Sequence, residues 1–166
     1  MLRKVANNVF CHTDDIAVLD LECLEFIKNK AKESPLQRAR INFHNSDSQM
    51  LHEMIIAMTN KTVVEPHLHP GRSESFHIID GVVRIGFADS DGSLERMIEL
   101  GKGRSFYRMN SPKWHMVVPM TEMVTVHETT NGPFVRGESS VFPSWDATVV
   151  DTLRQTIQLA DPDNPL

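Results

Sequence analysis

Closely spaced turn signals are the feature that most constrains the fold of this chain. From Arg38 onward, short runs rich in Val, Ile, Phe and Thr are separated by "NSDS", "TNK", "HPGR", "DG", "DSDGS", "GKG", "NSP" and "NGP". Many short strands separated by turn residues are typical of an antiparallel sandwich or barrel. The sequence predicts strands over residues 38–44, 50–58, 62–68, 73–80, 82–88, 94–99, 104–109, 115–118, 122–129 and 134–136.

Two segments outside this region have helical patterns. In residues 13–33 apolar side chains recur at helical spacing, Thr13 or Asp20 is suited to cap the helix, and "KESP" ends it. Residues 147–159 allow a short second helix before a tail that frays. The predicted organisation is therefore a helical N-terminal arm, a β-barrel and a C-terminal tail, over residues 1–37, 38–146 and 147–166.

Composition restricts the class of partner. The length of 166 residues suits one domain, and a net charge of -5 gives no general attraction for nucleic acid or acidic lipid. No stretch approaches the roughly 20 apolar residues of a membrane span, and the start has no apolar signal region, so we expect a cytoplasmic protein. Cys11 and Cys23 form no CxxC pair, which disfavours a disulfide framework or a thiolate zinc site. Small molecules, metals or other proteins remain as partners.

The stretch "PHLHPGRSESFHIIDG", residues 66–81, carries the clearest chemical signal. Side chains two apart on a strand share a face, so His67 and His69 project together. A turn at "PGR" then lets Glu74, on the next strand, return to that face. This spacing predicts a metal site, because buried imidazoles otherwise need a hydrogen-bond partner for each nitrogen.

The third imidazole is expected from a distant strand, where "SPKWHMVV" supplies His115. Three neutral imidazoles and one carboxylate suit Zn, Fe, Mn, Ni or Co and leave positions open for water or substrate. We therefore expect one divalent metal ion, with its identity left open. The alternative is that these residues are unrelated polar side chains on the surface.

This spacing resembles the first motif of the cupin superfamily, in which HxH is followed by four residues, Glu, six residues and Gly. His67, His69, Glu74 and Gly81 fit it without a gap, and Pro112 and His115 match the second motif. The resemblance implies an all-β fold, a jelly-roll barrel with a metal at its centre, preceded here by the N-terminal helix.

Longer segments resemble the WbuC-type cupins more narrowly. They are "ESPLQRARINFH", "PHLHPGRSESFHIIDG", "IGFADSDGSLERMIEL" and "WHMVVPMTEMVTVHETTNGPF", and the similarity runs from about residue 33 to residue 145. Members of that group are often encoded near polysaccharide and O-antigen genes. The resemblance therefore implies a place in polysaccharide biosynthesis, but no settled reaction.

The segment "RARINFH" alternates polar and apolar side chains. As a strand it has one donor-rich face, which could lie in water or grip a carboxylate or phosphate. We predict that this face lines the metal cavity and binds an anionic or polyhydroxylated part of the substrate. The four predicted substrate-binding residues are Arg38, Arg40, Asn42 and His44.

Site chemistry limits the functional prediction to a few alternatives. The favoured one is a metal-dependent enzyme acting on a small polar or anionic, sugar-like substrate by isomerisation or related acid/base chemistry. A non-catalytic binding or sensing protein and an iron-dependent dioxygenase are the alternatives, and no catalytic residue is assigned. Tyr107, the single tyrosine, is expected to be a buried phenol with one hydrogen bond, with a pocket acid as the alternative. We also expect a homodimer.

Overall fold

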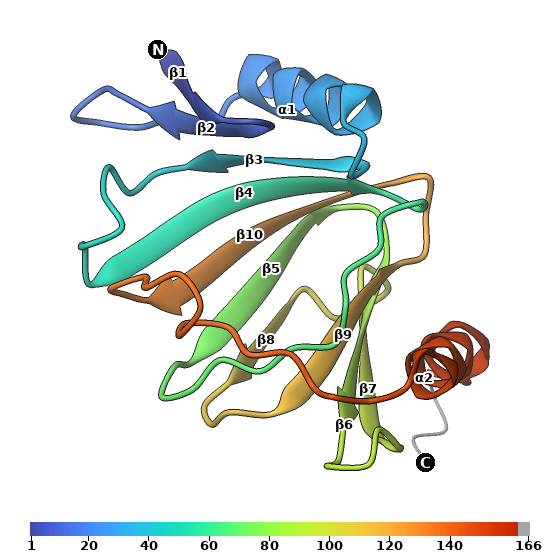
Figure 1. Ribbon diagram of the computed structural model, residues 1–166. Helices are drawn as coiled ribbons and strands as arrows, with labels where there is room; N and C mark the ends of the chain where they lie inside the picture. The colour runs from blue at the N-terminus through green and yellow to red at the C-terminus, as the bar shows by residue number, and fades with distance from the viewer. Residues whose placement is uncertain (163–166) are drawn as a thin grey trace.

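The computed structural model describes residues 1–162, which form a mostly β protein with two helices (Figure 1). The strands are β1 (Leu2–Ala6), β2 (Val9–His12), β3 (Arg38–Asn42), β4 (Leu51–Thr59), β5 (Glu74–Asp80), β6 (Val83–Ala88), β7 (Leu94–Leu100), β8 (Phe106–Met109), β9 (Trp114–Pro119) and β10 (Met123–Asn131). The helices are α1 (Leu21–Glu33) and α2 (Ala147–Leu159).

The strands form two sheets rather than a closed barrel. The large sheet has the order β1-β2-β3-β4-β10-β5-β8, and the small sheet has the order β7-β6-β9. The predicted strand 62–68 would lie beside β9, but it forms isolated bridges at His67 and Leu68 alone. Pro66, which lacks an N–H group, interrupts pairing there. The expected barrel is therefore an open two-sheet sandwich within residues 1–162.

The main core lies between the two sheets. Because side chains alternate along a strand, β4 turns Met58 inward while Ala57 faces the other way, and β9 turns Val117 inward while Met116 faces outward. The buried inner residues include Met58, Phe76, Val83, Ile85, Phe87, Leu100, Tyr107, Met109, Val117, Val124 and Val126.

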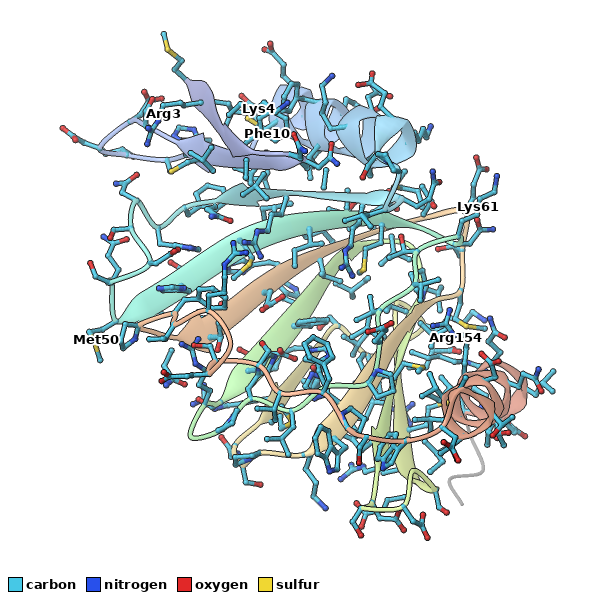
Figure 2. The ribbon with its side chains drawn as sticks, in the orientation of Figure 1. Arg3, Lys4, Phe10, Met50, Lys61 and Arg154 are labelled. Carbon is cyan, nitrogen blue, oxygen red and sulfur yellow. The ribbon has the colours of Figure 1, made fainter. Side chains whose placement is uncertain are left out.

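The helices cover the outer faces of the sandwich. Helix α1 packs on β3 and β4, and Phe10 of β2 joins this layer with its ring centroid 4.8 Å from that of Phe26 (Figure 2). Helix α2 packs on β6, β7 and β9, where Leu153 and Ile157 are buried. Both sheets thus have an apolar cover, and the space between them holds the predicted ligands.

The N-terminal prediction was wrong in two respects. Residues 1–12 form the hairpin β1–β2, and β2 pairs in parallel with β3, so this region extends the large sheet. The helix begins at Leu21 rather than near residue 13; of the two predicted caps Asp20 is confirmed, since its side chain accepts a hydrogen bond from the backbone N–H of Cys23 at 2.8 Å. Thr13 instead donates to the carbonyl of Met1.

At the C-terminal end one prediction was wrong and one was confirmed. Residues 134–136 form no strand, because the N–H of Val135 donates to Ser139 Oγ and the chain turns there. The helix over 147–159 has the predicted bounds. The last part of the predicted tail, residues 163–166, lies outside the described residues.

The glycine of the HxH motif occupies the β5–β6 turn. Gly81 has a φ of 82°, in the left-handed region that side chains disfavour. A Cβ atom there would also collide with the carbonyl oxygen of Met123. This position therefore requires glycine for backbone reasons, independently of any ligand.

Candidate metal centre and cavity

The structure brings the four predicted metal ligands together. His67 and His69 lie in the extended segment before β5, Glu74 is the first residue of β5, and His115 is the second residue of β9. One potential ligand atom of each lies within 4.8 Å of all the others. Two backbone hydrogen bonds between His67 and His115, of 3.0 and 2.9 Å, fix the segment against β9. Residues 48 positions apart in the chain therefore share one site.

Backbone carbonyl groups orient all three imidazole rings. The Nδ1 atoms of His67, His69 and His115 lie 2.9, 2.8 and 2.9 Å from the carbonyl oxygens of Glu65, Ser139 and Lys113. Since a carbonyl oxygen accepts a hydrogen bond, each neutral ring carries its proton on Nδ1. Each Nε2 atom then presents a lone pair, which is the form that binds a metal.

Glu74 lies at the centre of this group. Its Oε2 atom is 3.1 Å from His69 Nε2, and its Oε1 atom is 3.7 Å from His115 Nε2. The hydroxyl of Tyr107 donates to Oε1 at 2.7 Å, so the expected single hydrogen bond of this phenol is confirmed. Burial alone would raise the pKa of Glu74, but the neighbouring groups of His115, His69 and Tyr107 outweigh it and lower the pKa.

The donor atoms fit a divalent cation. His115 is fully buried, and its Nε2 atom has no hydrogen-bond partner among the described residues. A buried nitrogen lone pair beside a carboxylate is unfavourable unless a proton or a metal ion lies between them. Three nitrogen donors and one oxygen donor match the first-row divalent metals and leave coordination positions open.

The surroundings of His67 and His69 shift the pKa values of these two histidines in opposite directions. Burial lowers the pKa of His67 to about 4, and the adjacent His115 adds to this effect. Burial also opposes charge on His69, but its contact with Glu74 outweighs that effect and raises the pKa. Near neutral pH His67 is therefore uncharged, and of these two ligands His69 is the one at which a proton competes more strongly with a metal.

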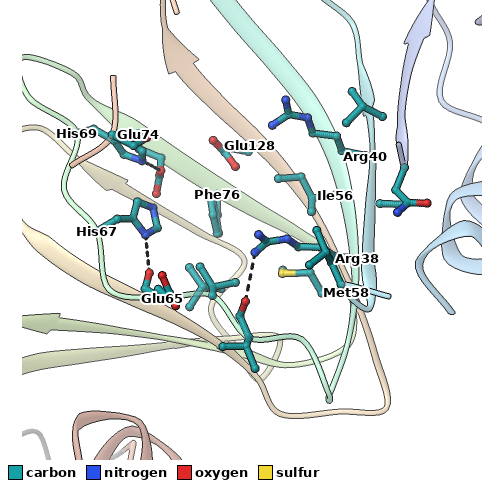
Figure 3. Close-up of a pocket in the computed structure, with 18 of the residues that line it drawn as sticks. Arg38, Arg40, Ile56, Met58, Glu65, His67, His69, Glu74, Phe76 and Glu128 are labelled. Carbon is teal, nitrogen blue, oxygen red and sulfur yellow. Dashed lines mark hydrogen bonds and ion pairs between the residues drawn. The ribbon is translucent and has the colours of Figure 1, made fainter. Parts of the chain in front are cut away.

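The metal candidates open onto a cavity of about 720 Å³. Arg38 and Arg40 line it together with His67, His69 and Glu74, and Figure 3 shows the two guanidinium groups facing the histidines across the space. The volume is in the range of small-ligand sites. Two of the four predicted substrate-binding residues thus share the cavity with the predicted ligands.

The other two predicted substrate-binding residues lie elsewhere. Asn42 and His44 are buried, and neither is among the described residues that line the cavity. The ring of His44 stacks on His52 with centroids 4.1 Å apart, and its Nδ1 atom lies 3.1 Å from the carbonyl of Glu53. The row of donor side chains that begins on β3 therefore extends beyond the cavity, and Asn42 and His44 lie in the protein interior instead.

Glu128 of β10 is a cavity residue that the sequence analysis missed. It lies in the lining between Glu74 and Arg40 (Figure 3), and no described residue forms a hydrogen bond or ion pair with its carboxyl group. Burial and the charge of Glu74 raise the pKa of Glu128 to about 8, against the opposing effects of Arg40 and His69. The available signal was its position in the inward row of β10 after Val124 and Val126, two buried core residues.

Comparison with known proteins supports the fold more than the function. A family profile described as "Domain of unknown function (DUF6016)" matches residues 19–100. No curated protein matches the chain. Within residues 1–162, neither helix combines the length and apolar character that crossing a membrane requires.

Solved structures with similar folds share low sequence identity with this chain. Protein SO0799 from Shewanella oneidensis is 12% identical, with 74% of this chain and 86% of that chain covered and a TM-score of 0.55. The capsular polysaccharide assembling protein CapF from Staphylococcus aureus is 13% identical, with 63% and 29% covered and a TM-score of 0.51. A cupin superfamily protein from Desulfitobacterium hafniense is 14% identical, with 57% and 76% covered and a TM-score of 0.45.

These likenesses concern the fold alone. The open two-sheet sandwich is the arrangement that this chain shares with SO0799 and CapF. Several solved chains are much longer than this one, which spans 29% of CapF and 27% of another. The two-sheet fold and the cluster of three histidines and one glutamate together define a candidate metal centre in a β-sandwich.

Proposed function

We propose that this chain is a metal-dependent enzyme that acts on a small polar or anionic substrate by isomerisation or related acid/base chemistry. The observation that carries the proposal is the convergence of three Nε2 lone pairs on Glu74, with His115 Nε2 buried and unpartnered. His67, His69, Glu74 and His115 would hold a divalent metal ion, which would supply Lewis-acid chemistry: polarisation of a carbonyl or hydroxyl group, or a lowered pKa of water.

The other cavity residues have complementary parts in this proposal. Arg38 and Arg40 bind the anionic group of the substrate, since guanidinium groups pair well with carboxylate and phosphate. Glu128, with a pKa of about 8, holds a proton near neutral pH and can donate it to a substrate atom within the cavity. This carboxyl group favours an enzyme over a purely binding or sensing protein, because recognition of an anion alone gains nothing from it.

The remaining predictions extend this proposal. Kinship with the WbuC-type cupins and a place in polysaccharide biosynthesis rest on the sequence resemblance. The homodimer, the small-molecule partner and the cytoplasmic location rest on the sequence features described above. Iron-dependent dioxygenase chemistry stays an alternative for the same ligands, because nitrogen and carboxylate donors suit iron as well as zinc.

Metal analysis tests the proposal directly. Protein purified without chelator is expected to contain close to one divalent metal per chain by elemental analysis. The double variant His67→Ala/His115→Ala is expected to contain none, because it removes two of the four donors. His77→Ala, which removes an exposed histidine from β5, is the matched control and retains the metal. Full metal content in the double variant would disprove the assignment.

The variant Tyr107→Phe tests whether the hydrogen bond from the phenol to Glu74 strengthens metal binding. The change removes the hydrogen bond to Glu74 Oε1 and leaves the ring in place. Loss of such an outer partner is expected to weaken Zn²⁺ binding by about 10- to 100-fold, measured by competition with a chromophoric chelator. Arg108→Gln, an exposed change on the same strand, serves as the control. An unchanged affinity in Tyr107→Phe would show that the phenol does not support the site.

A further inference from the structure

The cavity has two polar ends. At one end lie His67, His69 and Glu74, and at the other the guanidinium groups of Arg38 and Arg40 (Figure 3). Arg38 donates to the carbonyl oxygen of Val63 at 3.5 Å, the outer limit of a hydrogen bond. Neither arginine forms an ion pair with a residue in the part of the chain that the structure describes. The second end therefore offers positive charge that no protein carboxylate neutralises by direct contact.

Apart from Glu128, the wall between these ends is largely apolar (Figure 3). Phe76 lies between the histidines and the arginines in Figure 3, Ile56 lies between the side chains of the two arginines, and Met58 lies beside Arg38. Val117 of β9 also belongs to the lining. None of these four side chains bears a strong hydrogen-bonding group, so the hydroxyl groups of a sugar lying here would lose their partners in water without replacement.

The rim of the cavity also carries apolar side chains. Leu36, Val63 and Phe142 belong to the lining, although their side chains are 62%, 54% and 62% exposed. Large apolar side chains held in water around a concave site are typical of a ligand-binding surface. The acidic side chain of Glu65 also belongs to the lining, and it limits where a second negative charge could lie.

We propose that the substrate is a small amphipathic acid, with a phenyl- or short alkyl-sized body against Ile56, Met58, Phe76 and Val117 and an anionic group paired with Arg38 and Arg40. The inference rests on the proposed function in that it assigns this cavity to the substrate. It narrows the substrate from the sugar-like compound that the sequence favours to one with a single charged group on an apolar body.

Three matched probes test this inference by isothermal titration calorimetry on Zn²⁺-loaded protein. The probes are 4-phenylbutyrate, gluconate (a carboxylate with a polyhydroxylated body) and 4-phenylbutan-1-ol (the same apolar body without the charge). 4-Phenylbutyrate is expected to bind at least about tenfold more tightly than either, because each comparison removes one of the two interactions. Its binding should also show a negative heat-capacity change, the mark of apolar burial.

Two variants localise the binding. Arg38→Gln is expected to weaken the binding of 4-phenylbutyrate by about tenfold or more, because a charge-assisted pair is lost, and to leave the metal content unchanged. Ile56→Thr, which replaces an apolar side chain of the wall by a smaller one with a hydroxyl group, is expected to narrow the difference in affinity between 4-phenylbutyrate and gluconate. Arg96→Gln, an exposed change on β7 outside the cavity lining, is the control.

The outcomes separate this inference from the proposed function. Gluconate binding as tightly as 4-phenylbutyrate, an Arg38→Gln variant with wild-type affinity, or no 4-phenylbutyrate binding at about 10 mM would overturn the inference, even if the metal is present. Conversely, Arg38-dependent binding of 4-phenylbutyrate by a chain that holds no metal would support the inference and overturn the proposed metal function.

Discussion

Arg84→Met is expected to lower the free energy of unfolding by about 3–5 kcal/mol, the usual effect of breaking a buried ion pair. Arg84 Nε donates to Glu99 Oε2 at 2.8 Å, and both side chains are buried between β6 and β7. The Nη1 atom donates to the carbonyl oxygens of Ile157, Gln158 and Ala160 at the end of α2. The substitution thus leaves buried Glu99 with the exposed Lys102, 3.8 Å from its Oε1 atom, as its remaining ion-pair partner, and it removes the cap of a helix that covers the small sheet.

Urea denaturation of paired variants separates these two effects. Arg84→Met/Glu99→Met is expected to recover much of the loss, because it removes the buried carboxylate whose buried partner is gone, and the remaining deficit is the lost helix cap. Lys113→Met is the control: it removes an ion pair with Glu95 whose side chains are 49% and 41% exposed, and such pairs contribute about 0–1 kcal/mol. If Arg84→Met lowers the free energy of unfolding no more than Lys113→Met does, Arg84 does not have the stabilising role assigned to it.

Local patterns were sufficient to predict the central strands and the metal candidates. His67, His69 and Glu74 depend on period-two alternation and one turn, which are properties of sixteen consecutive residues. Helix α2 was likewise predicted with its observed bounds, since its pattern is continuous. His115 is distant in the sequence, so the spacing of the motif could not show that it lies near the other ligands. In the structure its backbone pairs with that of His67 and brings it to the site.

Long-range pairing explains what the sequence analysis missed. Strands β1 and β2 are five and four residues long, and β2 joins the sheet through a parallel pairing with β3, which leaves no local signal. Asn42 shares the inward row of Arg38 and Arg40, but where the cavity ends along β3 depends on side chains from other strands. Glu128 was missed for the same reason, because a lone glutamate at an inward position is informative only once the opposing residues are known.

Metal affinity is expected to fall by up to about 30-fold as the pH drops from 6.5 to 5.0, since one competing proton changes the affinity by at most tenfold per pH unit. The competing proton belongs to His69, whose pKa is raised from 6.5 by Glu74 despite the opposing effect of burial. A raised pKa means that the metal-free site already binds this proton at the top of the window, whereas metal binding requires the lone pair. Lower pH therefore favours the metal-free form.

Proton release measures this competition without knowledge of the reaction. His67, with a pKa of about 4, stays neutral across the window, and the lowered pKa of Glu74 keeps that carboxylate ionised. Titration of Zn²⁺ near pH 6 in two buffers of different ionisation enthalpy should show about one proton released from His69 for each metal bound. His77→Gln, at an exposed position, should release the same number. A Zn²⁺ affinity that does not change between pH 5.0 and 6.5 would show that Glu74 does not hold a proton on His69, and the assigned electrostatics of the site would be wrong.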